Sequence, residues 1–187
     1  MLYQNLVIEK ASTETGPSIL DLLKSRASHL KSKGSKQWSF LLTGLEDAEI
    51  LELVSKGYFY KVLYQSNNQS MGVASPLVAT FMLSAQQEEW DIHLWGQEES
   101  PDTVYLHKLA VSLDHKGEGL GDQLLDWIKQ HIQKRGYTKI RLDCVADSEK
   151  LKDFYEKNGF VLLDMVDKHC LYEWQPSVRP ANIVGGS

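Results

Sequence analysis

A glycine-rich turn between a predicted strand and a predicted helix constrains this 187-residue chain more than any other feature. Residues 116–121 read KGEGLG and follow an apolar, strand-like run over 104–111. After the turn, apolar residues recur every four positions from Leu120 to Ile132, which predicts an amphipathic helix that ends near Gly136. Glycine lets the backbone approach a ligand closely, and a helix start offers unpaired N–H groups and the positive end of its dipole. The arrangement predicts an anion site, most naturally for a phosphate or pyrophosphate.

Two common nucleotide-binding motifs do not fit this turn. A dinucleotide-binding turn reads GxGxxG, whereas the third glycine here comes one residue early. A P-loop reads GxxxxGK followed by Ser or Thr, and the chain contains no such string. The pattern that remains is KxxGxG, for which an ordinary strand-to-helix loop is the alternative interpretation.

A second motif lies about thirty residues further on and supports the interpretation of the first. Residues 154–160 read FYEKNGF at the end of a predicted helix, and a strand-like run over 139–145 separates the two motifs. This pair, at this separation, resembles the GNAT N-acetyltransferases, whose first motif is Arg/Gln-x-x-Gly-x-Gly/Ala. Lys116 departs from that motif by keeping the positive charge of Arg without its planar fork. The close resemblance covers residues 104–160, and the first hundred residues agree in layout only.

The order of predicted elements indicates a mixed α+β domain. Strands are expected at 7–10, 58–65, 77–84, 104–111, 139–145, 161–163 and 169–174, and helices at 16–33, 44–56, 120–135 and 151–158. Within the acidic segment 86–102, only 92–94 has the character of regular structure. The resemblance implies the GNAT fold, a mixed central sheet with splayed middle strands flanked by helices. We expect one such domain over 1–175 and a loose tail over 176–187.

The resemblance implies acetyl-CoA as co-substrate and assigns its binding mainly to the backbone. Leu109 and Val111 would pair with the pantetheine arm, and the turn would present N–H groups to the pyrophosphate. Ser148 would contact the pantetheine or, as the preferred alternative, cap the helix that follows. The full set of expected cofactor-binding residues is Leu109, Ala110, Val111, Lys116, Gly117, Glu118, Gly119, Leu120, Gly121, Asp122 and Ser148.

Two residues are expected to be catalytic. Tyr155 matches the tyrosine that many GNAT enzymes use to protonate the leaving thiolate. His107 resembles a histidine of arylalkylamine N-acetyltransferases, and imidazole can take up a proton near neutral pH. Strand alternation would place Tyr105, His107, Leu109 and Val111 on one face. A strand histidine with a structural hydrogen bond is the alternative for His107, and either Tyr105 or a water chain could replace it as base.

Composition limits the remaining function classes. The net charge of −5 argues against a nucleic-acid partner, and no apolar run approaches the ~20 residues of a membrane helix. Cys144 and Cys170 lie in strand-like runs without CxxC spacing, so no metal is expected. The N-terminus lacks the pattern of a signal peptide, which predicts a cytoplasmic protein. The expected function is acetyl transfer from acetyl-CoA to a primary amine of a small molecule or peptide, with a non-catalytic acyl-CoA-binding module as the alternative and a homodimer as the usual assembly of similar proteins.

Overall fold

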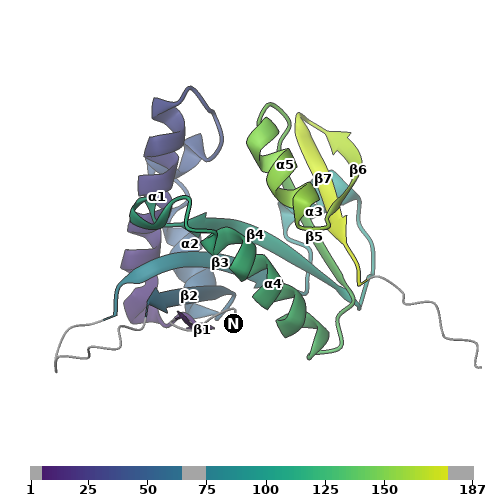
Figure 1. The fold of residues 1–187 in the computed structure, drawn as a ribbon, viewed down its shortest axis with the longest axis horizontal. Coiled ribbons are helices and arrows are strands. Elements are labelled where there is room, and N and C mark those ends of the chain that lie inside the picture. The colour runs from purple at the N-terminus through teal and green to yellow at the C-terminus, as the bar shows by residue number, and fades with distance from the viewer. Residues whose placement is uncertain (1–5, 65–74, 177–187) are drawn as a thin grey trace, which may run out of the picture.

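The computed structural model describes residues 6–64 and 75–176, which form one seven-stranded sheet with helices on both faces (Figure 1). The tail expected at the C-terminus lies outside the described residues beyond position 176. The elements, in chain order, are β1 (Leu6–Lys10), α1 (Gly16–Ser32), α2 (Asp47–Ser55), β2 (Phe59–Tyr64), β3 (Leu77–Ser84), α3 (Glu89–Trp95), β4 (Thr103–Val111), α4 (Leu120–Gln133), β5 (Lys139–Val145), α5 (Glu149–Lys157), β6 (Val161–Val166) and β7 (His169–Trp174).

The strands follow the order β1-β2-β3-β4-β5-β7-β6, and the pairing between β4 and β5 is the only parallel pairing among them. That pairing is short, because it joins Thr103–Tyr105 to Lys139–Arg141 and no further residues. Beyond it the two strands diverge, as Figure 1 shows between the halves that carry α1 and α5. The expected splay of the middle strands is therefore confirmed. It leaves the β5-facing edge of β4 without a strand partner from Leu106 to Val111.

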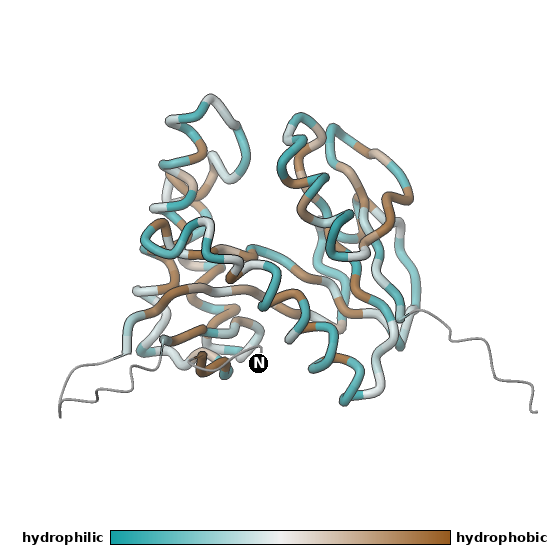
Figure 2. Tube along the Cα trace, viewed as in Figure 1, coloured by the Kyte–Doolittle hydropathy of each residue, from teal (hydrophilic) through white to brown (hydrophobic). Residues whose placement is uncertain are grey.

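Two hydrophobic clusters occupy opposite faces of the sheet. Neighbouring strand residues such as Phe59 and Tyr60 divide between them, as the alternation of side chains along a strand requires. One cluster packs against α4 and α5, and its helical members include the fully buried Leu124 and Ile128. The other packs against α1 and α2. In Figure 2 the hydrophobic stretches follow the strands, whereas α4 alternates between hydrophobic and hydrophilic residues as predicted.

Helix α3 corrects the expectation that only 92–94 is structured in the segment 86–102. A capping box starts the helix, in which Glu88 and Asp91 exchange hydrogen bonds with each other's backbone N–H groups. The helix packs on the sheet face opposite α4 and α5, where Trp95 lies against Arg141, with 4.5 Å between the ring centroid and the guanidinium carbon. A helix of seven residues contains too few apolar positions for their period to be recognised in the sequence. The Glu-x-x-Asp spacing of Glu88 and Asp91 is nevertheless a signal for the start of a helix.

Candidate active site

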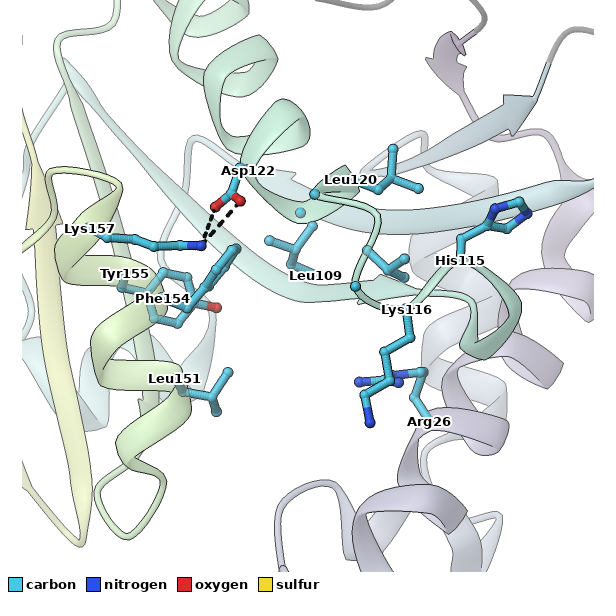
Figure 3. A pocket seen from close by; sticks show the side chains of 14 residues that line it. Arg26, Leu109, His115, Lys116, Leu120, Asp122, Leu151, Phe154, Tyr155 and Lys157 are labelled. Carbon is cyan, nitrogen blue, oxygen red and sulfur yellow. Dashed lines mark hydrogen bonds and ion pairs between the residues drawn. The ribbon is translucent and has the colours of Figure 1, made fainter.

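A cavity of about 380 Å³ opens where β4 and β5 diverge. Four segments line it, namely α1, the end of β4, the glycine turn with the start of α4, and α5 (Figure 3). The cavity therefore brings together both sequence motifs, which are about thirty residues apart in the chain.

The glycine turn forms the edge of the cavity next to the N-terminus of α4. Gly117 and Gly119 both have left-handed backbone conformations, with φ of 88° and 73°, which glycine adopts without steric cost. Gly119 is the N-cap residue of α4, and it supplies no side chain to satisfy the first N–H groups of the helix. These groups and the helix dipole face the cavity edge, which is the arrangement expected for an anion site.

Gly121 has a different role from the one expected of a phosphate-facing glycine. A Cβ atom built at this position would lie 3.0 Å from Cζ of Phe154. The missing side chain thus allows the first turn of α4 to pack against α5. Gly121, the second glycine of the KxxGxG motif, therefore sets the distance between α4 and α5, which form two walls of the cavity.

We expect Gly121→Ala to lower the free energy of unfolding by about 1–3 kcal/mol, because the added methyl group overpacks the contact with Phe154. Chemical denaturation would measure the change. The double variant Gly121→Ala/Phe154→Leu should recover part of the loss, since leucine removes the ring that the methyl group meets. A fully stable single variant would contradict this packing role.

One wall of the cavity carries two cationic side chains, of which only Lys116 was predicted from the sequence. Lys116 and Arg26 extend into it from the turn and from α1 (Figure 3). Within the described part of the chain, Arg26 makes no hydrogen bond or ion pair, and its partial burial lowers its pKa. Nothing in the local sequence marks Arg26 as a site residue, since it comes from a helix ninety residues before the turn. An unpaired cation on a cavity wall indicates an anionic ligand.

Asp122 ties the start of α4 to the end of α5. Its carboxylate accepts hydrogen bonds from Asn158 (2.7 Å) and Lys157 (3.1 Å). Burial alone would raise the pKa of Asp122, but these two donors outweigh it and hold its pKa below the usual range. Asp122 lines the cavity with its charge already paired, so its role there is to join two walls.

Strand β4 contains a bulge that corrects the predicted alternation. Its register with β3 passes from Ala110 opposite Thr80 to His107 opposite Met82, so β4 carries one extra residue, and Lys108 has a φ of 50°. As a result, Leu109 and Val111 face the cavity and the α4 side of the sheet. Tyr105 and His107 lie on the opposite face, because the extra residue of the bulge shifts the alternation of side chains along β4. The sequence offers no local signal for the bulge, since lysine is not a residue that favours positive φ.

Tyr155 lies on α5 at the floor of the cavity and is buried except for the part that lines it (Figure 3). Burial, with smaller contributions from Cys144 and Asp143, raises its pKa far above the usual value. The phenol therefore stays protonated at neutral pH and can act as a hydrogen-bond or proton donor inside the cavity.

His107 lies outside the cavity, on the other face of the sheet. Its Nε2 atom is 3.1 Å from Oδ2 of Asp91 on α3, but the contact is not aligned as a hydrogen bond. Burial raises the pKa of Asp143 on β5, and the charges of His169 and, less strongly, His107 oppose that rise. Neither Asp143 nor Asp91 was singled out from the sequence.

Three expected cofactor-binding residues do not line the cavity. Ala110 is buried in the cluster that packs against α1 and α2, and Glu118 pairs with His115 at 3.0 Å. Ser148 caps α5, because its hydroxyl accepts the N–H of Leu151, which confirms the capping alternative. The other eight expected cofactor-binding residues all line it: Leu109, Val111, Lys116, Gly117, Gly119, Leu120, Gly121 and Asp122.

Two further properties hold for residues 6–64 and 75–176. No three His, Cys, Asp or Glu side chains gather in a group able to hold a metal ion. No helix in these ranges combines the length and apolar character needed to cross a bilayer.

Comparison with known sequences agrees with the fold and the cavity. The sequence model of the acetyltransferase (GNAT) family matches residues 35–160, more than half of the chain. The uncharacterized N-acetyltransferase YesJ of Bacillus subtilis (strain 168) is 38% identical over 147 residues, which are 79% of this chain and 77% of YesJ. The chain therefore belongs to the GNAT family and is an acyltransferase.

Solved structures show the same fold over nearly the whole chain. A GNAT-family acetyltransferase from Listeria monocytogenes superimposes with a TM-score of 0.75 at 25% identity, covering 91% of this chain and 94% of its own. The PaiA N-acetyltransferase of Thermoplasma acidophilum, in complex with coenzyme A, superimposes with a TM-score of 0.67 at 16% identity, covering 92% and 99%. At that identity the second likeness shows the fold alone.

Proposed function

We propose that this GNAT acyltransferase transfers the acetyl group of acetyl-CoA to a primary amine by direct attack. The observation that carries the proposal is the cavity at the splay of β4 and β5, which joins an unpaired strand edge, a helix N-terminus, two cationic side chains and a buried phenol. Each of these features suits one part of an acyl-CoA molecule.

The phosphates would bind at the glycine turn. N–H groups at the start of α4 would donate hydrogen bonds to the pyrophosphate, and Arg26 and Lys116 would balance its charge. The pantetheine arm carries two amides and would extend along the free edge of β4 beside Leu109 and Val111. This path leads the thioester to Tyr155.

The transfer needs two proton movements. The amine nitrogen attacks the thioester carbonyl carbon, the C–S bond breaks, and the leaving thiolate takes the proton of Tyr155, which regains a proton from the nitrogen as the neutral amide forms. The amine must lose a proton, and for an amine of pKa near ~10.4 this costs roughly 4–5 kcal/mol at pH 7. His107 would accept that proton from the other face of the sheet. In the part of the chain that the structure describes, no Cys or Ser is placed as an activated nucleophile, so no covalent enzyme intermediate is proposed.

Arg26→Leu should weaken acetyl-CoA binding about 10- to 100-fold, because a charge-assisted hydrogen bond contributes roughly 1.5–3 kcal/mol. Calorimetric titration of the folded variant would measure Kd. Arg135→Leu is a matched control, since Arg135 lies just beyond the far end of α4. Equal affinity for the wild type and Arg26→Leu would remove Arg26 from the phosphate site.

The proposed function is tested by titrating the protein with acetyl-CoA and then measuring thiol release in the presence of a panel of primary amines. We expect saturable binding and an amine-dependent release of coenzyme A. Failure to bind acetyl-CoA at millimolar concentration would contradict the proposal.

A further inference from the structure

A second polar cluster lies on the sheet face opposite the cofactor cavity. It consists of Asp91 on α3, Tyr105 and His107 on β4, and Asp143 on β5, and we call it the inner cluster. The side chains of Asp91 and His107 are 3% and 14% exposed, and Oδ2 of Asp143 is 3.9 Å from Nε2 of His169. The two carboxylates thus contact two different imidazoles, Asp91 that of His107 and Asp143 that of His169 on β7.

Two buried polar atoms of the inner cluster lack hydrogen-bond partners among the described residues. They are the hydroxyl oxygen of Tyr105, whose residue is 2% exposed, and Nε2 of His107. Burial, and to a smaller extent the charge of Asp91, raises the pKa of Tyr105, so the hydroxyl stays protonated beside that carboxylate. The carboxylate of Asp91, 3.1 Å away, partly compensates Nε2 of His107. An unpaired buried polar group costs about 1–3 kcal/mol, so the Tyr105 hydroxyl points to a ligand that would complete its hydrogen bond.

An acidic hollow adjoins the inner cluster. Glu49 of α2 and Glu88, Glu89 and Trp90 of α3 line it, and we call these four residues the rim. Asp91 of α3 meets His107, and Glu46, the residue before α2, meets Lys108 at 3.4 Å, so the starts of both helices lie over consecutive residues of β4. The hollow between α2 and α3 therefore opens above this part of β4.

The rim consists of three glutamates and a tryptophan and includes no cation of its own. Among the described residues, none of its three glutamates forms an ion pair, because Lys108 pairs with Glu46 and Lys56 pairs with Glu52 at 2.6 Å. Trp90 is 42% exposed; its ring stacks on His93, with 5.3 Å between the ring centroids, and the exposed part of an indole ring attracts cations. The cofactor cavity on the other side has cations instead, notably Arg26 and Lys116. The two faces thus differ in the sign of charge they attract.

We propose that the acceptor is a small linear amine with a second positive charge, such as an α,ω-diamine. The reacting amine binds in the inner cluster, where its N–H groups bond to Asp91, Asp143 and the Tyr105 hydroxyl, and its proton passes to Nε2 of His107. The second ammonium group binds at the rim, between the glutamates and Trp90. This inference rests on the proposed function and adds a substrate class to it.

The test compares 1,4-diaminobutane with n-butylamine at saturating acetyl-CoA, by the ratio of their kcat/KM values. We expect the diamine to be favoured at least 10-fold in the wild type. The double variant Glu49→Gln/Glu89→Gln should bring that ratio toward one by raising KM for the diamine. Glu88 is not substituted, because it caps α3. Asp21→Asn/Glu99→Gln removes the same charge from exposed positions outside the rim and should keep the wild-type ratio.

A second readout does not depend on turnover. The diamine should bind to the complex of the protein with coenzyme A in a calorimetric titration, and the rim variant should weaken that binding about 10-fold. Turnover of both amines with a ratio near one in the wild type would overturn the inference and leave the proposed function standing. Absence of turnover with every amine would contradict the proposed function, and the inference with it.

Discussion

Replacing Tyr155 with Phe should lower kcat about 10²- to 10⁴-fold, the usual contribution of a general acid. The substitution removes the hydroxyl group that lines the cavity and keeps the ring that packs against Phe154 and Phe160. Kd for acetyl-CoA should change by less than a factor of about three, because the proposed hydrogen bond forms mainly as charge develops on sulfur. Single-turnover kinetics combined with calorimetry would separate the two effects.

The pH dependence gives Tyr155 a second signature. Because burial raises its pKa, the phenol stays protonated through the neutral and mildly alkaline range, and the wild-type rate should show no fall there from its ionisation. Tyr60→Phe is the matched control, since it removes a buried hydroxyl that bonds to His131 at 3.1 Å, away from the cavity. If Tyr155→Phe and Tyr60→Phe both keep kcat within a factor of two of the wild type, Tyr155 has a packing role only.

Gly119→Val should weaken acetyl-CoA binding at least 10-fold. Gly119 has a φ of 73° and no atom within 4 Å of an added Cβ, so the new side chain would project from the cavity edge where the pyrophosphate is proposed to bind. Valine is also strained at positive φ, which by itself costs about 1–3 kcal/mol of folding stability. Calorimetry on the folded fraction would give the change in affinity.

Gly136→Val separates strain from ligand exclusion. Gly136 has a φ of 86°, equally open surroundings and a position beyond the far end of α4. Both variants should lose similar stability in chemical denaturation, and only Gly119→Val should lose affinity. Equal affinity of the two variants would move the phosphate site away from the turn.

Local patterns predicted most of the fold, because buried faces leave a period in the sequence. The strand at 139–145 has the expected bounds, and α4 starts at Leu120 as expected and ends at Gln133, two residues early. The amphipathic pattern of α4 corresponds to its buried residues. Helix α3 was missed because seven residues contain too few apolar positions to show a period. The splay of β4 and β5 came from the family resemblance, since no residue pattern encodes where two strands stop pairing.

The site was predictable where it depends on backbone and motif, and less so where it depends on distant contacts. The glycine turn was singled out from its residue types and spacing and Tyr155 from the family resemblance, and both line the cavity. Arg26 reaches the cavity from another helix, and Asp91 reaches His107 from an insertion between two strands, so only the tertiary fold reveals them. The bulge at Lys108 moved His107 to the opposite face from Leu109, and a single extra residue of this kind is invisible to an argument from strand alternation.

The central claim is that an acyl-CoA bound in the cavity passes its acetyl group across the splay of β4 and β5 to an amine. The most direct measurement follows coenzyme A thiol and N-acetylated amine in the same reaction, by a thiol reagent and by mass spectrometry. We predict equal amounts of the two products, formed at a rate that depends on the enzyme, on the amine and on Tyr155. Saturable binding of acetyl-CoA with no acetylated product from any amine would contradict the claim, and it would identify the protein as an acyl-CoA-binding module instead.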